Sequence, residues 1–150
     1  MICDFARPDF GQEERDAVNR VLAGTWLAAG PENEAFEAEF ARYVGSKHAI
    51  CVNSGSSANL LALASLALPK GSRVLTSACG FPATLAPILH LGLTPVLVDY
   101  DLATLNIDTR MTYKLLDNHD IQAVLFAHTL GNPVFLGEIK SLADACDTII

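Results

Sequence analysis

The sequence contains, at residues 73–99, the stretch RVLTSACGFPATLAPILHLGLTPVLVD. Its two short apolar runs, 73–76 and 95–99, predict strands. Between them, residues 82–90 begin with proline at the favoured first position of a helix, and Gly92 follows as a stop signal. The two runs are apolar throughout, as in a parallel sheet that is covered on both faces. The stretch therefore predicts one strand–helix–strand unit.

The same alternation continues on both sides of this unit. Glycine and proline mark the ends of two N-terminal helices, and apolar runs then alternate with helical segments. The further predicted helices lie at residues 12–23, 31–44, 56–68, 111–116 and 135–145, and the further predicted strands at 48–53, 123–127 and 148–150. This order predicts an α/β domain with a mainly parallel sheet.

Composition narrows the class of protein. Of the 150 residues, 51% are hydrophobic and 18% are charged, which excludes a disordered chain. A net charge of −7 without a basic run argues against nucleic acid or a membrane surface as partner. No apolar run reaches the ~20 residues of a spanning helix, and the opening MICDFARPDF lacks the pattern of a signal peptide. We therefore expect a cytoplasmic protein.

The cysteines and histidines show no metal-ligand spacing, so no metal site is predicted.

The first candidate site follows the predicted strand at 48–53. Residues 53–59 read NSGSSAN, so Gly55, Ser56 and Ser57 stand where a helix begins. Glycine permits close approach of a ligand, and the unpaired N–H groups of a first helical turn attract phosphate. Another interpretation is that Ser56 or Ser57 only caps the helix. The segment matches neither common phosphate-loop pattern and lacks the second glycine of a nucleophile elbow.

Two more predicted strand ends carry candidate residues, because ligands of open parallel sheets gather at the carboxyl ends of strands. Phe81, in a Gly-Phe-Pro turn, could present its ring to a flat ligand or belong to the core. After the strand at 123–127, His128 could contact a ligand or serve as scaffolding, and Asn132 lies in an ordinary Gly-Asn-Pro turn.

In order along the chain, these segments resemble the DegT/DnrJ/EryC1/StrS family of sugar aminotransferases. The resemblance runs from about Phe10 to Ile150, through GTWLAAGPENEAFEAEFARYVGSKHAICVNSGSSANLLAL, VLTSACGFPATLAPIL, LGLTPVLVDYDLATLNID and AHTLGNP. It implies the three-layer αβα large domain of fold type I pyridoxal-phosphate enzymes. NSGSSANLLAL, GFPAT and AHTLGNP are closest to the branch of nucleotide-sugar 3-dehydrases typified by CDP-4-keto-6-deoxyglucose 3-dehydrase.

The resemblance also implies roles for individual residues. Gly55, Ser56 and Ser57 match the positions that hold the phosphate of pyridoxal or pyridoxamine 5′-phosphate, and Phe81 matches the aromatic that stacks on its ring. Trp26 lies in WLAAGP, which matches a segment near the sugar in the family, although alanines replace the usual hydroxyl residues. With His128 and Asn132, Trp26 is expected to bind a nucleotide-linked keto sugar.

The family pattern also implies what this stretch does not contain. The acid that holds the pyridine nitrogen protonated follows the predicted last strand in the family, and no lysine here matches the Schiff-base position. We therefore assign no catalytic residue and expect no turnover from these residues alone. A [2Fe–2S] cluster would belong only to an intact protein. The sequence reads as a truncated large domain, ending in DACDTII.

Three functions stay open at this point. The first is 3-dehydration of a 4-keto-6-deoxysugar in deoxysugar or lipopolysaccharide biosynthesis, the second is transamination of such a sugar, and the third is a non-catalytic binding or dimerising fragment.

The resemblance implies a homodimer. It also implies that residues 1–47 form a helical segment packing on the large domain, whose first part is residues 48–150.

Overall fold

A computed structural model describes residues 7–24, 26–118, 120–134, 137, 139–141 and 148–149. By its internal packing the chain divides into two compact units, Met1–Cys51 and Val52–Ile150. The boundary falls close to the predicted division between residues 47 and 48. The packing of the first segment on the second stays a prediction, and each unit is described here by itself.

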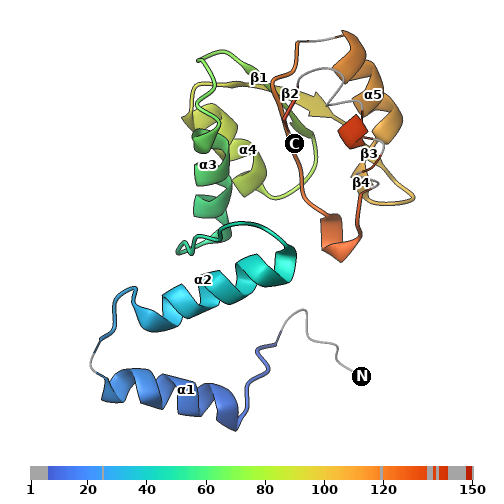
Figure 1. The fold of residues 1–150 in the computed structure, drawn as a ribbon. Helices are drawn as coiled ribbons and strands as arrows, with labels where there is room; N and C mark the ends of the chain where they lie inside the picture. Colours follow the sequence, from blue (N-terminus) through green and yellow to red (C-terminus); the bar gives the residue numbers. More distant parts are fainter. Residues whose placement is uncertain are drawn as a thin grey trace. The chain divides into compact units, whose positions relative to one another are not determined.

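The first unit consists of two helices, and both have the bounds that the sequence predicts. Helix α1 spans Gln12–Ala23 and α2 spans Pro31–Val44 (Figure 1). Gly45 ends α2 with a φ of 73°, a left-handed conformation that favours glycine. On α2, the rings of Phe36 and Phe40 stack with centroids 5.7 Å apart.

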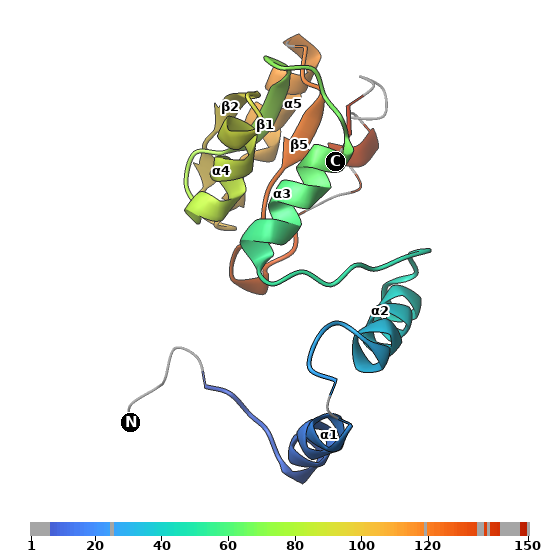
Figure 2. The same cartoon turned by 90° about the vertical axis from the view of Figure 1, so that its left-hand side faces the viewer.

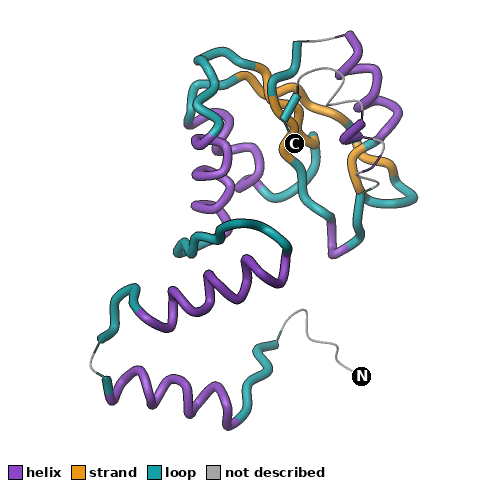
Figure 3. Tube along the Cα trace, in the orientation of Figure 1, coloured by secondary structure: helices purple, strands orange, loops and turns teal. Residues whose placement is uncertain are grey.

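The predicted strand at residues 48–53 is wrong in this structure. The segment is a loop between α2 and α3, as Figure 3 shows. Within the described residues no strand pairs with it, and Ile50 is 80% exposed. Its apolar composition gave the strand signal, but a strand also needs a neighbour to satisfy its backbone groups. Here the Cys51 N–H donates instead to Glu37 Oε1, at 2.6 Å.

The second unit is an α/β layer structure. Its elements are α3 (Gly55–Ser65), β1 (Arg73–Ser77), α4 (Pro82–His90), β2 (Thr94–Val98), β3 (Tyr100–Asp101), β4 (Asn106–Ile107), α5 (Thr109–Asn118), β5 (Ala123–Leu125) and the 3₁₀ turn η1 (Thr129–Gly131). The sheet has the order β2-β1-β5, and both pairings are parallel. Ile149 adds a parallel bridge to Ala123, in the region of the predicted last strand.

Two apolar clusters hold the layers together, one on each face of the sheet. On one face Val74 of β1 packs in a cluster with Leu63 of α3 and Ile88 of α4. On the other face Leu75 packs in a cluster with Leu116 of α5. Alternate residues of β1 thus point to opposite clusters, as strand geometry requires. Figure 2 shows α3 and α4 on one side of the sheet and α5 on the other. The predicted three-layer αβα architecture is confirmed.

Strands β3 and β4 and the 3₁₀ turn η1 were not predicted, and the helix predicted at 135–145 falls mostly on residues that the structure does not describe. Strands β3 and β4 form a short antiparallel hairpin, which the sequence hides because each strand has two residues. Of the helix predicted at 135–145, residues 135, 136, 138 and 142–145 lie outside the described residues. In the part of the chain that is described, no helix has the length and apolar character needed to cross a membrane.

Candidate functional site

Three predicted site segments meet at one end of the sheet in the second unit. Figures 1 and 2 place the start of α3, the start of α4 and η1 at the end where the parallel strands β1 and β5 finish. This is the edge where open parallel sheets bind ligands, because loops and helix N-termini face it together.

Ser54 caps helix α3, and this decides how the two following serines are used. The Ser54 hydroxyl accepts a hydrogen bond from the Ser57 N–H at 3.2 Å and donates to the Ser57 hydroxyl at 3.1 Å. The Ala58 N–H donates to the Ser54 carbonyl at 3.0 Å, which closes the first turn. The interpretation that Ser56 or Ser57 caps the helix is therefore wrong: the cap is Ser54.

The first turn of α3 presents several unused donors. Within the described part of the chain, the N–H groups of Gly55 and Ser56 and the Ser56 hydroxyl have no hydrogen-bond partner. The Ser57 hydroxyl accepts from Ser54 and keeps its own proton for donation. Nothing lies within 4 Å of the position a Cβ of Gly55 would take, so the turn is open above its backbone. Together with the helix dipole, these donors can hold an anion such as phosphate.

Phe81 lies next to this turn. It immediately precedes α4, is 78% exposed, and lines a cavity of about 370 Å³ together with Ser56 and Ser57. The Asn59 side chain of α3 donates to the Ala83 carbonyl of α4 at 3.1 Å, which joins the two helix starts. The structure thus brings two of the three predicted phosphate residues, Ser56 and Ser57, and the predicted ring residue to one cavity. A large side chain this exposed is free to cover a flat ligand.

Tyr100 is a residue of this edge that the sequence did not reveal. Its hydroxyl is 3.3 Å from the hydroxyl of Thr129 and 3.4 Å from the position a Cβ of Gly80 would take. Gly80 has a φ of 151°, which side chains rarely adopt. Tyr100 therefore lies between the segment that carries Phe81 and the segment that carries His128. No sequence motif marks it, since the contact joins residues far apart in the chain.

The loop after β5 places His128 and Asn132 differently. His128 is exposed, and its Nδ1 accepts a hydrogen bond from the Val134 N–H at 3.1 Å. The Asn132 side chain donates to the Thr104 carbonyl at 2.6 Å and lines a second cavity, of about 670 Å³, beside β4. Asn132 is thus engaged in holding the loop, whereas Nε2 of the exposed His128 has no hydrogen-bond partner among the described residues.

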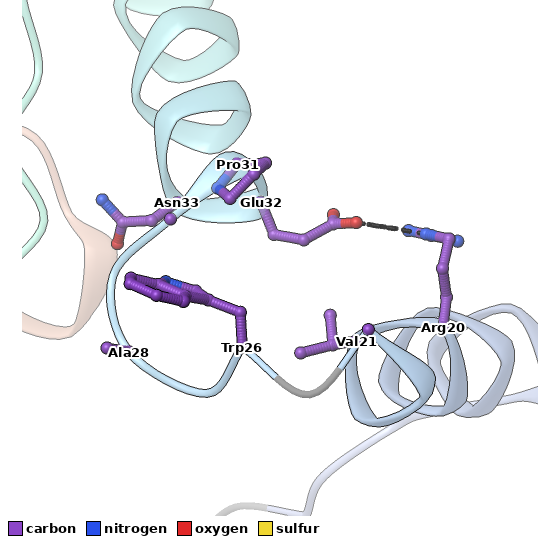
Figure 4. A pocket seen from close by; sticks show the side chains of 9 residues that line it. Arg20, Val21, Trp26, Ala28, Pro31, Glu32 and Asn33 are labelled. Carbon is purple, nitrogen blue, oxygen red and sulfur yellow. Dashed lines mark hydrogen bonds and ion pairs between the residues drawn. The ribbon is translucent and has the colours of Figure 1, made fainter.

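Trp26 belongs to the first unit and lines a separate cavity of about 240 Å³ between α1 and α2 (Figure 4). Its indole N–H donates to the Ala29 carbonyl at 3.0 Å, so the ring faces are what it can offer a ligand. Gly30 makes room for the ring, because a Cβ there would lie 2.7 Å from it. The ion pair between Arg20 and Glu32, at 3.0 Å, borders the same cavity.

Comparison with known proteins finds one matching family and several similar proteins. The model of the DegT/DnrJ/EryC1/StrS aminotransferase family matches residues 8–150. The chain is 42% identical over 142 residues to lipopolysaccharide biosynthesis protein RfbH of Salmonella typhimurium, with 89% of this chain and 32% of that protein covered. It is 41% identical over 155 residues to dTDP-4-dehydro-2,6-dideoxy-D-glucose 3-dehydratase of Saccharopolyspora spinosa, with 92% and 33% covered.

The fold of the chain is also similar to that of a solved enzyme structure. The E. coli GDP-4-keto-6-deoxy-D-mannose-3-dehydratase with bound hydrated PLP superposes with a TM-score of 0.90 at 31% identity, over 96% of this chain and 39% of that one. The chain spans about a third of the length of the curated relatives it matches.

Proposed function

The chain belongs to the DegT/DnrJ/EryC1/StrS aminotransferase family, and from this we propose that it contributes the phosphate-binding and ring-stacking part of a nucleotide-sugar enzyme that uses pyridoxal or pyridoxamine 5′-phosphate. The observation that carries the proposal is the single cavity shared by Ser56, Ser57 and Phe81. A flat ring that bears a phosphate needs an anion site and an apolar plate next to each other, and both line this cavity.

The residues present fit the phosphate end of such a cofactor. The free N–H groups of Gly55 and Ser56 and the two serine hydroxyls would donate to phosphate oxygens. The Ser54 cap would keep these donors in place, because it fixes the turn without using them. Charge-assisted hydrogen bonds of this kind are stronger than bonds between neutral groups. Gly55 would let the phosphate approach the backbone closely.

The ring end fits through Phe81. Its exposed ring precedes α4, and the link between Asn59 and Ala83 fixes the start of that helix relative to α3. A bound cofactor of this type supplies a ring that delocalises the charge left when a proton is removed next to a carbon–nitrogen double bond. The residues of this chain would bind and orient that ring and exclude water from one of its faces. We assign none of them a proton-transfer step.

For the reaction we propose 3-dehydration of a nucleotide-linked 4-keto-6-deoxysugar. Support comes from GFPAT and HTLGNP and from the 3-dehydratases named above, which match the chain at 41% and 31% identity. Transamination of the same class of sugar is the second candidate, favoured by the family as a whole. A non-catalytic binding fragment is the third, and a [2Fe–2S] cluster would belong to the first candidate alone.

The remaining parts of the proposal concern the setting of the site. We propose that Trp26, His128 and Asn132 contribute to sugar binding, that the protein is cytoplasmic, and that residues 1–47 pack on the large domain. A homodimer is proposed as well. It is supported by large apolar side chains left on the surface of the second unit, such as Leu102 and Leu130, which are 87% and 82% exposed.

A product analysis tests the reaction. Because no turnover is expected from these residues alone, the assay uses protein that also carries the part of the relatives' length that this chain does not span. This protein is incubated with pyridoxamine 5′-phosphate and GDP-4-keto-6-deoxymannose or its dTDP-glucose counterpart, and the products are identified by mass spectrometry. If the reaction is dehydration, the product is a sugar that has lost its 3-hydroxyl. If the reaction is transamination, the product is a sugar that keeps its 3-hydroxyl and carries an amino group where the keto group was. Saturable cofactor binding without either product supports the non-catalytic candidate. Absence of both binding and product contradicts the proposal.

A further inference from the structure

Asn106 is a buried side chain of the β3–β4 hairpin whose amide is hydrogen-bonded at both ends. It is 3% exposed at the start of β4, and its amide uses both ends. Nδ2 donates to the Asn132 carbonyl at 3.0 Å, and Oδ1 accepts from the Thr129 N–H at 3.1 Å. A buried amide satisfied at both ends fixes the groups that it joins, since leaving either end unpaired is costly.

The loop of residues 128–134 is held at further points. The Asn132 side chain donates back to the Thr104 carbonyl at 2.6 Å, in the turn between β3 and β4. The Thr129 hydroxyl lies 3.3 Å from that of Tyr100, on β3. Val134, at the end of the loop, is 6% exposed and belongs to the core. The β3–β4 hairpin and the core therefore brace this loop from both ends.

The position of this loop determines which of the two ring nitrogens of neutral His128 carries the proton. The Val134 N–H donates to Nδ1 at 3.1 Å, so Nδ1 is the acceptor and the proton resides on Nε2. The ring also meets Phe126 edge-on, with centroids 6.0 Å apart. The side chain is exposed, which leaves Nε2–H available to a ligand. In this arrangement Nε2 of the neutral His128 ring is a hydrogen-bond donor.

We propose that Asn106 is a positioning residue of this site, which fixes the loop so that His128 presents its Nε2–H to an acceptor oxygen of the bound ligand. The inference rests on the proposed function for the identity of that ligand, which is the phosphorylated ring cofactor; this contact is additional to the part in sugar binding proposed above for His128. Tyr100 supports it, since its hydroxyl is near both Thr129 and Gly80, the neighbours of His128 and Phe81.

The first test reads the tautomer of His128 directly. Imidazole ¹⁵N spectra of the purified protein, assigned with His128→Gln, should show the Nε2–H tautomer. Asn106→Leu should replace it with a mixture, whereas Asn106→Asp, which keeps the acceptor for Thr129, should retain part of it. Thr112→Val is the matched control, because Thr112 is also buried and donates to a backbone carbonyl, that of Asp108, at 2.8 Å. It should lower stability without changing the His128 signal.

The second test uses pyridoxamine 5′-phosphate as the probe. Asn106→Leu should weaken its binding by about tenfold, the equivalent of ~1.4 kcal/mol. Thr112→Val should leave it unchanged. If the wild type binds and Asn106→Leu binds equally well, or if the wild type holds the Nδ1–H tautomer, the positioning role is wrong while the proposed function stands. If the wild type does not bind, the proposed function fails, and the tautomer spectra alone decide the role of Asn106.

Discussion

The hydroxyl of Tyr100 lies 3.3 Å from the hydroxyl of Thr129, which joins the β3–β4 hairpin to the loop after β5. The same oxygen lies beside Gly80, one residue before Phe81. One side chain thus contacts two of the three segments that carry the candidate ligand residues of the second unit, those of Phe81 and His128. Its removal should affect the site more than the fold.

Tyr100→Phe should lower the affinity for pyridoxamine 5′-phosphate while costing about 1 kcal/mol of unfolding free energy, the value of one hydrogen bond. Gly80→Ala should be more damaging to both quantities, because its backbone has a φ of 151°. Fluorescence titration and urea unfolding measure the two effects. Tyr43→Phe is the control, since Tyr43 is 89% exposed and lies in the first unit. Equal binding by Tyr100→Phe and wild type would show that Tyr100 does not shape the site.

The serines of α3 should separate stability from binding. Ser54→Ala removes the cap and should cost about 1 kcal/mol of unfolding free energy. Ser56→Ala should change stability by less than about 0.5 kcal/mol, as an exposed substitution does, yet weaken cofactor binding. Paired urea unfolding and cofactor titrations check both variants. A Ser56→Ala variant that loses stability but keeps its cofactor affinity would contradict this prediction and would indicate a purely structural role for Ser56.

Gly30→Ala should move Trp26. A Cβ at residue 30 would lie 2.7 Å from the indole ring, so the ring must leave its place. Trp26 is the single tryptophan of the chain, and its fluorescence emission therefore reports the change without labelling. Gly11→Ala is the matched control, because its Cβ would meet Glu14 at an ordinary 3.7 Å. An unchanged emission spectrum in Gly30→Ala would contradict the placement of Trp26 against Gly30.

Thr76→Val should stabilise the protein. Among the described residues, the Thr76 hydroxyl is buried in the centre of β1 without a hydrogen-bond partner. Replacing it with a methyl group removes a desolvated polar atom, and we expect a gain of about 1 kcal/mol. Thr112→Val should lose about the same amount, since the Thr112 hydroxyl has a partner. Urea unfolding measures the unfolding free energy of both variants. A lower value for Thr76→Val as well as for Thr112→Val would mean that the Thr76 hydroxyl contributes to stability.

The sequence predicted the elements whose signals are local. The bounds of α1, α2 and α4 follow from Gly24, Gly45 and the prolines at helix starts, and the structure reproduces them. The apolar runs of β1, β2 and β5 predicted a doubly covered parallel sheet, which the two apolar clusters confirm. Candidate residues at strand ends followed from the same topology.

Features that depend on distant partners could not be predicted. Residues 48–53 have a strand composition but no paired neighbour in the described chain. The roles of Tyr100 and Asn106 come from hydrogen bonds to residues 23 to 29 positions away, which no local pattern reveals. The cap of α3 was assigned to the wrong serines, because three serines within four residues all have the right chemistry.

The most direct test of the central claim compares pyridoxamine 5′-phosphate with pyridoxamine, which lacks the phosphate, in fluorescence titrations of the purified protein. If Ser56, Ser57 and the first turn of α3 hold the phosphate, the phosphorylated form should bind saturably and roughly 10- to 100-fold more tightly, the equivalent of charge-assisted hydrogen bonds worth ~1.5–3 kcal/mol. Phe81→Ala should weaken both forms. Equal affinity for the two compounds, or binding of neither, would contradict the account.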